Sequence, residues 1–330
     1  MRRILLVVLL VLLVAASATA GYFIFGVPRS VQVPVSFPVA NHSSISIGAD
    51  TDFTKPGTGS GCECVRSGTG QELDPYVISD WIVNSSSTDG VVIYGTKAYF
   101  VITRVVLHGT SHDRGIYFEQ VMNGVVENCL ITGWWFGIYT FGSSSLRFIN
   151  NTVVGNQYGI QLEFSNGNSL IANRFDENGQ LGIFLRGSNN VLRNNSATRN
   201  GWGGINVDGT TGSANENQLE SNVVSENGVF GIGVWRGAGN TLRLNTVLGN
   251  NGTGIMLTDH STKSLIEENT VLGNAGGGIV LIDGSSGNTI RGNTATGNGD
   301  GVDHFDLYDR GSDNIWQNNK YATKQPDSID

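Results

Sequence analysis

Apolar and polar residues alternate over short stretches of this chain, and glycine or asparagine separates one stretch from the next. Leu242 and Val247 flank Asn245 in one such stretch, and Ile255 follows Gly254 in the next. Alternation with a period of two over so few residues, bounded by turn-forming residues, predicts short β-strands rather than helices.

This strand pattern repeats with a period of about 24 residues. One asparagine series marks the repeat: Asn128, Asn151, Asn173, Asn195, Asn222, Asn245, Asn269, Asn293 and Asn319. A second series follows most of these at a fixed offset: Asn156, Asn178, Asn200, Asn227, Asn250, Asn274 and Asn298. A Gly-Ile or Gly-Val pair comes next in each unit and extends upstream to Gly90-Val91, so the repeat begins before the asparagine series does.

Strands of this length cannot bury an apolar face alone, so successive units must stack on one another. About three strands fit into each unit, and the short connections favour parallel stacking. We therefore predict an all-β chain that forms a parallel β-helix solenoid of about ten turns. The expected organisation is a signal or anchor segment at 1–27, a linker and N-terminal cap at 28–73, the β-helix at 74–324 and a tail at 325–330.

The asparagine series are expected to be structural, because asparagine tolerates left-handed backbone and stacked amides can bond along a column. Asn245 should accordingly be buried at a corner. One apolar column is expected to point inward: Val125, Phe148, Leu170, Leu192, Leu219, Leu242, Ile266, Ile290 and Trp316. The next position should point outward, and we interpret its alternating charges as a stabilising ladder of Arg193, Glu220, Arg243, Glu267 and Arg291.

The unit Glu268–Asn274, followed by Gly278-Ile279, has the form of a known family repeat, and Asp74–Ile78 with Trp81 has the form of its first turn. On these residues the chain resembles the right-handed parallel β-helix superfamily with pectate-lyase-type repeats, and within it the NosD-like group of exported carbohydrate-binding and sugar-hydrolase-related proteins. The resemblance covers about residues 70–324 and implies a right-handed coil. It implies no particular reaction, because one fold carries many functions.

The N-terminus has the features of an export signal. Arg2 and Arg3 precede an apolar run, and Ala18-Thr19-Ala20 offers a cleavage pattern. The uncharged stretch continues from Ile4 to Val27, which is long enough to span a bilayer. A cleaved signal peptide and a retained membrane anchor remain alternatives, and both predict an exported protein that is either secreted or anchored in the cell envelope.

Amino-acid composition and net charge exclude some fold classes and partners. The chain has 46 glycines and 33 asparagines among 330 residues. Both residue types disfavour the interior of a helix, so a helical bundle or coiled coil is not expected. The net charge is −8 and no basic tract is present, so nucleic acid is not an expected partner. The sequence identifies no cofactor.

Three cysteines leave several pairings open. Cys62 and Cys64 could form a local disulfide, or one of them could pair with Cys129. A soft-metal site on the Cys62–Cys64 pair is a further alternative, although no His-rich or Met-rich run accompanies it. Near the other end, residues 303–309 depart from the repeat, which we interpret as a C-terminal cap rather than a carboxylate site.

The candidate ligand-binding side chains are expected on the strand that follows each Gly-Ile pair. Two outward columns are expected there, one through Tyr117 and Tyr139 and one through Glu119, Glu163 and Arg186. Aromatic faces beside charged groups suit sugar rings. The candidate carbohydrate-binding residues are therefore Tyr117, Glu119, Tyr139, Glu163, Arg186, Asp208 and Trp235. Trp134, Trp135, Tyr158, Trp202 and Phe230 are expected in the turn just before this strand.

Three functions fit these observations. The first is a polysaccharide-binding or cell-surface structural solenoid. The second is a polysaccharide lyase, hydrolase or epimerase, for which Glu163 and Asp208 would lie two turns apart, in the range of an inverting carboxylate pair. The third is a NosD-like accessory protein of metal-centre assembly, which would need soft ligands such as Cys62 and Cys64.

Overall fold

The structure is a computed structural model that describes residues 40–329, except for residues 56, 58–60, 111, 300–301 and 303. The expected signal or anchor segment at 1–27 lies outside the described residues. Within the described part, no helix is both long and apolar enough to cross a membrane.

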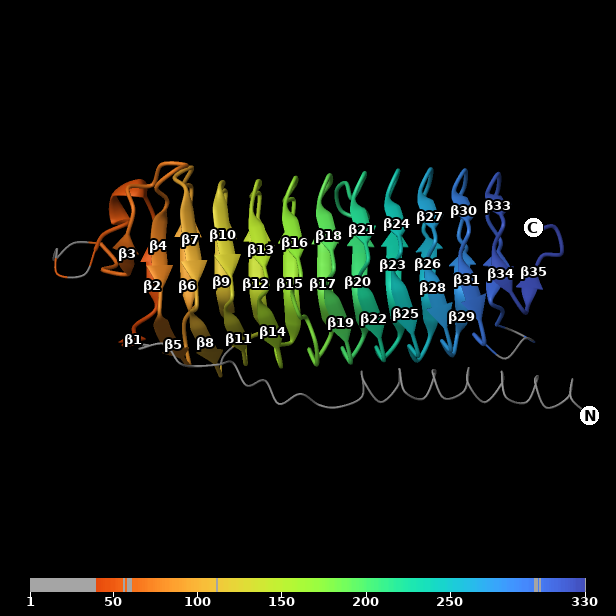
Figure 1. Cartoon of the computed structure of the whole chain (residues 1–330), viewed down its shortest axis with the longest axis horizontal. Coiled ribbons are helices and arrows are strands. Elements are labelled where there is room, and N and C mark those ends of the chain that lie inside the picture. The colour runs from red at the N-terminus through yellow and green to blue at the C-terminus, as the bar shows by residue number, and fades with distance from the viewer. Residues whose placement is uncertain are drawn as a thin grey trace, which may run out of the picture. The chain divides into compact units, whose positions relative to one another are not determined.

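The described chain winds into a solenoid whose walls are parallel β-sheets (Figure 1). The sheet that follows the Gly-Ile pairs, called here the first sheet, has twelve strands. They are β2 (Ile45–Ile47), β6 (Val91–Tyr94), β9 (Arg114–Glu119), β12 (Phe136–Phe141), β15 (Tyr158–Glu163), β17 (Leu181–Arg186), β20 (Gly203–Asp208), β23 (Phe230–Trp235), β26 (Thr253–Thr258), β29 (Gly277–Leu281), β32 (Leu307–Asp309) and β35 (Lys324–Gln325).

The second sheet also has twelve strands, and only its first pair, β3 with β4, is antiparallel within the described residues. It contains β3 (Val65–Ser67), β4 (Tyr76–Ser79), β7 (Phe100–Thr103), β10 (Gly124–Glu127), β13 (Arg147–Ile149), β16 (Ser169–Ile171), β18 (Val191–Arg193), β21 (Gln218–Glu220), β24 (Thr241–Arg243), β27 (Leu265–Glu267), β30 (Thr289–Arg291) and β33 (Ile315–Gln317).

The third wall is divided into a five-stranded and a six-stranded sheet. The five strands are β1 (Ala40–His42), β5 (Trp81–Ser85), β8 (Val106–Gly109), β11 (Leu130–Thr132) and β14 (Thr152–Val154). The six are β19 (Ser196–Thr198), β22 (Val223–Ser225), β25 (Thr246–Leu248), β28 (Thr270–Leu272), β31 (Thr294–Thr296) and β34 (Lys320–Tyr321). The predicted all-β solenoid of about ten turns is confirmed.

The core is a set of aligned apolar columns. Phe148, Leu170 and Leu192 pair in register on the second sheet and are fully buried, as expected. The first member of this column was predicted wrongly, because Val126 and not Val125 pairs with Phe148 and is buried. The error is one residue, which in a strand moves a side chain to the opposite face.

Asparagine ladders run along the corners of the coil. Asn245 is fully buried, and its Nδ2 donates to the Leu219 carbonyl at 2.8 Å and to Asn269 Oδ1 at 3.0 Å. Both predicted ladders repeat this pattern, but Asn128 is not a member. Cys129 takes the expected place, since its backbone N–H donates to Asn151 Oδ1 at 3.1 Å.

A third ladder, which the sequence analysis missed, occupies another corner. Its members are Asn168, Asn190, Asn217, Asn240, Ser264, Asn288 and Asn314.

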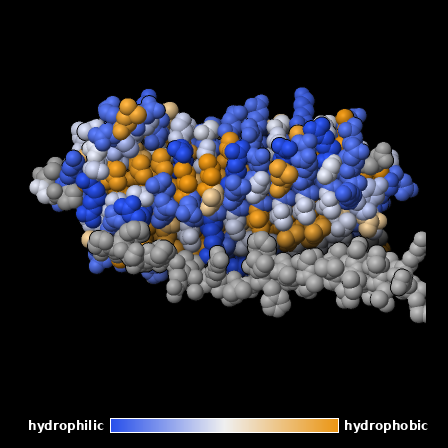
Figure 2. Space-filling view, viewed as in Figure 1, coloured by the Kyte–Doolittle hydropathy of each residue, from blue (hydrophilic) through white to orange (hydrophobic). Residues whose placement is uncertain are grey.

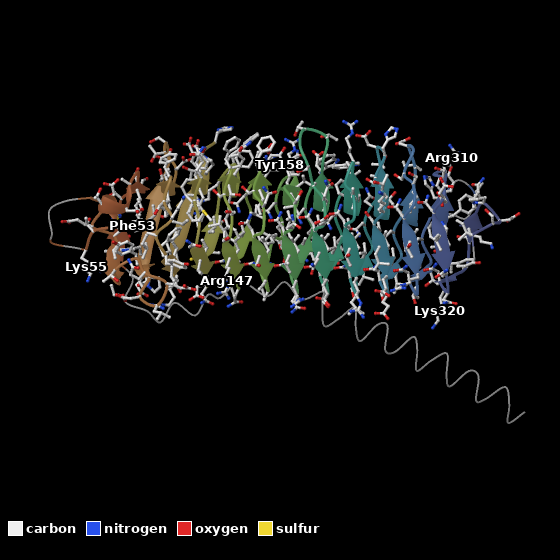
Figure 3. All side chains as sticks on the ribbon, turned by 90° about the horizontal axis from the view of Figure 1, so that it is seen from above. Phe53, Lys55, Arg147, Tyr158, Arg310 and Lys320 are labelled. Atoms are coloured by element: carbon white, nitrogen blue, oxygen red, sulfur yellow. A yellow bond between two sulfur atoms is a disulfide. The ribbon has the colours of Figure 1, made fainter. Side chains whose placement is uncertain are left out.

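The expected charge ladder on the second sheet is confirmed by two ion pairs, Arg193–Glu220 at 2.6 Å and Arg291–Glu267 at 2.6 Å. In Figure 3, Arg147 at the start of β13 and Tyr158 at the start of β15 lie on opposite edges of the solenoid.

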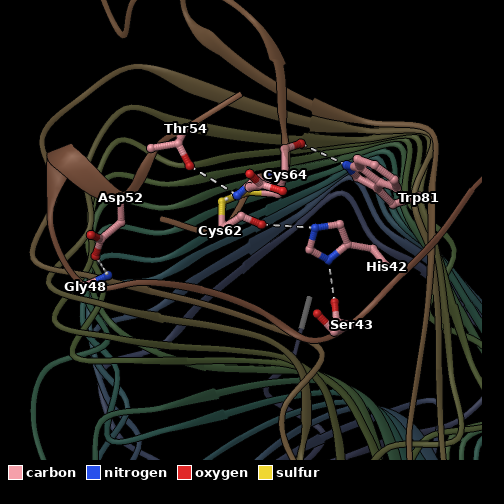
Figure 4. Close-up of a disulfide and its surroundings, with 9 residues drawn as sticks. His42, Ser43, Gly48, Asp52, Thr54, Cys62, Cys64 and Trp81 are labelled. Atoms are coloured by element: carbon pink, nitrogen blue, oxygen red, sulfur yellow. Dashed lines mark hydrogen bonds between the residues drawn. A yellow bond between two sulfur atoms is a disulfide. The ribbon is translucent and has the colours of Figure 1, made fainter. Parts of the chain in front are cut away.

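Two local structures lie at the ends. At the N-terminal end, β1, β2 and a 3₁₀ turn, η1 (Asp50–Asp52), extend the coil upstream of residue 74, and Cys62 is bonded to Cys64 (Figure 4). Cys129 is free and buried, so the alternative pairing with Cys129 is wrong. At the other end Asp306 closes the second ladder by accepting hydrogen bonds from Asn298, as a cap would.

Candidate functional site

All seven candidate residues lie on the first sheet, on the side that faces away from the core. The ladder pairs Tyr117 with Tyr139, and Glu163 with Arg186, on adjacent turns. Asp208 pairs with Trp235 in the same way. The alternate positions, such as Ile160 and Leu162, are core residues, so period-two alternation places the candidates outside.

An ion cluster occupies the middle of this face. Arg186 donates from Nη2 to Asp208 Oδ2 at 3.0 Å and from Nη1 to Glu163 Oε1 at 3.4 Å, so one guanidinium joins two carboxylates from the turns on either side. Gln161 Nε2 donates to Glu163 at 2.7 Å. Burial alone would lower the pKa of Arg186, but the contacts with Asp208 and Glu163 outweigh it and raise that pKa. The guanidinium therefore stays charged and held in place.

A first aromatic group lies towards the N-terminal end of this face. Tyr117 and Tyr139 stack along the sheet with ring centroids 5.6 Å apart, and Phe136 lies 5.2 Å from Tyr139. The Tyr117 hydroxyl donates to Glu119 Oε2 at 2.6 Å. Burial and the neighbouring Glu119 carboxylate raise the pKa of Tyr117, so this phenol remains protonated and is a poor base.

A second aromatic group lies on the other side of the ion cluster. Trp202 stacks on Trp235 with centroids 5.7 Å apart, and Phe230 meets Trp235 edge to face at 5.2 Å. Glycine makes room for these rings: a β-carbon on Gly203 would lie 2.3 Å from the Phe230 ring. The outward face thus carries aromatic, charged and again aromatic side chains along the coil axis.

Several residues in or beside the outward columns are less exposed than strand alternation indicates. Trp134 is only 2% exposed and fills the core, donating from Nε1 to the Leu107 carbonyl at 3.4 Å. Tyr158 and Phe230 were expected in the turn before the strand, but they are the first residues of β15 and β23, and Phe230 is also buried. Thr258 continues the outward column beyond Trp235 and was expected to be exposed, but it is buried and donates to Asp283 at 2.7 Å. Wide aromatic neighbours and ion pairs cover this face more closely than strand alternation alone indicates.

The pair Glu163 and Asp208 lies two turns apart, as expected, but Arg186 occupies the space between the two carboxylates. An inverting glycosidase needs room for a water molecule and a sugar between its acid and its base. The observed contacts make these two groups partners of a cation, which suits a binding surface better than such a pair.

Two features of this site were not recognised as functional from the sequence. The first is Asn206, which lies between Phe184 and Gly233 in the outward column and is only 1% exposed. The second is the longer connection after β20, where the ladder step from Asn190 to Asn217 is 27 residues instead of 22. A β-carbon on Gly212 in this connection would lie 3.0 Å from the Phe164 ring, so the loop reaches back beside the ion cluster. The longer spacing between Asn190 and Asn217 in the sequence could have indicated this loop.

The structure also bears on the soft-metal site considered for Cys62 and Cys64. The described part of the chain contains no group of three or more His, Cys, Asp or Glu side chains that could hold a metal ion. Cys62 and Cys64, the soft ligands considered for a metal site, are joined to each other.

Figure 2 shows apolar and hydrophilic residues interspersed on the visible face of the solenoid. A family model described as the right handed beta helix region matches residues 65–218 and 173–321. A comparison with curated protein sequences finds no match.

Solved structures with a similar fold include a mannuronan epimerase module and two tailspike proteins. The A-module of the mannuronan C-5 epimerase AlgE4 from Azotobacter vinelandii matches with a TM-score of 0.55 and 14% identity, over 86% of this chain and 90% of that one. The Dettilon tailspike protein matches with a TM-score of 0.63 and 17% identity, over 87% and 61%. The enzymatically active domain of bacteriophage CBA120 tailspike protein 2 matches with a TM-score of 0.50 and 11% identity, over 79% and 43%. This chain thus spans less than two thirds of either tailspike, and identities this low show similarity of fold.

Proposed function

Because the chain belongs to the right-handed β-helix family, we propose that it uses the outward face of its first sheet to bind an extended polysaccharide. The observation that carries this proposal is the order of side chains along the axis, with an ion cluster between two aromatic groups. From Tyr139 on β12 to Trp235 on β23 there are four strand steps, or about 19 Å. An oligosaccharide spans such a distance and a single sugar does not.

Each contact on this face suits a sugar polymer. Aromatic rings stack on the apolar faces of sugars, at about 0.5–1.5 kcal/mol for a stacked aromatic pair. Fixed polar groups between them orient the hydroxyls. A solenoid also offers similar positions on successive turns, so weak contacts can add up along a chain of sugars. The mannuronan epimerase among the structural neighbours supports a polysaccharide partner for this fold.

The proposed location is outside the cytoplasm, because the uncharged stretch from Ile4 to Val27 follows two arginines. The protein would be secreted or anchored in the cell envelope. Detection of an N-terminus at Gly21 by mass spectrometry supports secretion, whereas recovery of Met1 in carbonate-washed membranes supports an anchor.

The binding proposal is tested with polysaccharide arrays and pull-down of the purified protein. Trp235→Ala and Tyr139→Ala should each weaken binding, by about two- to tenfold for one lost stacking contact. Glu267→Ala, on the charge ladder of the second sheet, is the matched control and should bind as the parent does. Equal losses in the control and the aromatic variants would place the ligand on another face.

The same assay addresses an enzymatic function. A lyase, hydrolase or epimerase would change the bound polymer, releasing unsaturated or reducing ends or altering its sugar composition. Loss of that turnover in Glu163→Gln or Asp208→Asn, with binding retained, would assign catalysis to the ion cluster and replace the binding proposal.

A further inference from the structure

Asn206 is an unusual buried amide at the centre of the proposed binding face. It is 1% exposed, and neither its Nδ2 nor its Oδ1 has a hydrogen-bond partner among the described residues. Leaving such a buried group unpaired costs free energy, about 1–3 kcal/mol. Buried polar side chains without partners are rare in folded proteins, and one explanation for them is a group from outside the protein that completes the bonding.

The side chain of Asn206 lies outside the core, among the aromatic rings. Its strand neighbours Ile205 and Val207 are core residues, so alternation directs Asn206 away from the core. Phe184 adjoins it on one turn and Gly233 on the next. Over Gly233 lie Phe230 and Trp235, because a β-carbon there would be 3.1 Å and 3.6 Å from their rings. Because Asn206 is only 1% exposed, a ligand can reach the amide only when a neighbouring ring moves, and of Phe230 and Trp235 it is Trp235 that is partly exposed.

The charges around Asn206 are already balanced within the protein. Arg186, on the strand next to Asn206, is held by Asp208 and Glu163, and Arg236, one residue beyond Trp235, contacts Asp259 at 3.0 Å. A uronate carboxylate would have to separate one of these pairs to find a cation. It would also approach a protein with a net charge of −8.

The amide itself distinguishes neutral from acidic ligands. Its Nδ2 donates and its Oδ1 accepts, so both are satisfied only by a group that can accept and donate in turn. Sugar hydroxyls and acetamido groups do both, and a carboxylate only accepts. A uronate carboxylate placed at the amide would therefore leave Oδ1 unpaired in an apolar surrounding.

We propose that Asn206, between Phe184 and the rings of Phe230 and Trp235, is the polar anchor of a subsite for an uncharged sugar unit. This inference rests on the proposed function and specifies its ligand class: a neutral glycan rather than a polyuronate. Trp235 stacks on the sugar, and the amide exchanges hydrogen bonds with its hydroxyl or acetamido group.

The test measures binding of the full chain to neutral glucan, mannan and chitin oligosaccharides and to mannuronan and polygalacturonate oligosaccharides. A neutral ligand should bind, should perturb tryptophan fluorescence through Trp235, and should bind almost equally at about 0.05 M and 0.5 M salt. Asn206→Leu, which keeps the branched skeleton but removes both hydrogen-bonding atoms, should weaken binding about tenfold. Its melting temperature should not fall, because the unpaired amide is gone. Glu267→Gln is the control away from this face.

The outcomes separate this inference from the function on which it rests. Tighter, salt-sensitive binding of a polyuronate would overturn the neutral subsite while leaving polysaccharide binding intact. Unchanged neutral binding in Asn206→Leu would overturn the role of Asn206 alone. Absence of binding to every polymer tested would overturn both proposals. If Asn206→Leu does not fold, the salt response and the ligand preference of the parent protein decide the question.

Discussion

Replacing Asn245 by leucine tests how the corner ladders stabilise the coil. The Asn245 amide donates to the Leu219 carbonyl and to Asn269, and its Oδ1 accepts from both the backbone N–H and the Nδ2 of Asn222 at 3.0 Å. Leucine has the same branched heavy-atom skeleton as asparagine with bulkier ends, so the substitution removes these bonds without opening a cavity.

The magnitude follows from the groups that leucine leaves unpaired. Three buried groups lose a hydrogen bond: the backbone N–H and the Nδ2 of Asn222, and the carbonyl of Leu219. Asn269 Oδ1 still accepts from the Asn245 backbone N–H at 2.9 Å. Each unmet buried group costs about 1–3 kcal/mol, and partial relaxation of the turn lowers the sum. We expect a loss of about 3–5 kcal/mol in the free energy of unfolding, which corresponds to roughly 6–15 °C in the melting temperature.

Thermal unfolding followed by far-UV circular dichroism measures this loss. Asn251→Leu is the matched control, because Asn251 is exposed and the same chemical change there should cost less than about 0.5 kcal/mol. Equal shifts in melting temperature for the two variants would show that a ladder amide contributes no more to the free energy of unfolding than an exposed one. A stable Asn245→Leu protein would refute the assignment of three unmet groups.

Three further predictions follow from other parts of the chain. Leu244 is 44% exposed with a φ of 56°, so Leu244→Gly should raise stability by about 1 kcal/mol in the same thermal assay. Burial raises the pKa of the Cys129 thiol to about 12, so a thiol-specific reagent at pH 8 should label it only after unfolding, and should then find one thiol without reductant. The Arg104 side chain lowers the pKa of Asp80 below its ordinary 3.8, so the pair stabilises the folded state above that pH and loses its effect as pH falls through the lowered value. Acid-unfolding curves of Asp80→Asn should therefore lack this contribution.

The fold could be predicted because the same pattern of short strands and turn residues recurs in every repeat of the chain. An error in one unit, such as Val125 for Val126, does not change the architecture when eight other members of the column are placed correctly. Asn128 was misplaced for a related reason. Its spacing fits the ladder, yet Cys129 has the backbone position that bonds Asn151.

The site was harder to predict because it depends on contacts between side chains of different turns. Strand alternation indicated that Glu163, Arg186 and Asp208 share a face, but not that the guanidinium would join both carboxylates. Burial was missed for the same reason. Thr258 points away from the core and is nevertheless covered, because Asp283 on the next turn binds its hydroxyl. Such contacts depend on rotamers, which periodicity does not specify.

Asparagine has two different uses in this molecule, and the contrast separates scaffold from site. In the ladders, residues such as Asn222 and Asn245 are buried with their amides bonded to the turns before and after them. Asn206 is buried to the same degree, but it lies on the outer side of the first sheet with no partner for either polar atom among the described residues. A ladder amide stabilises the coil through bonds that are already made, so its replacement should change stability. An amide without such bonds adds nothing to the coil, so replacement of Asn206 should leave stability intact and change binding.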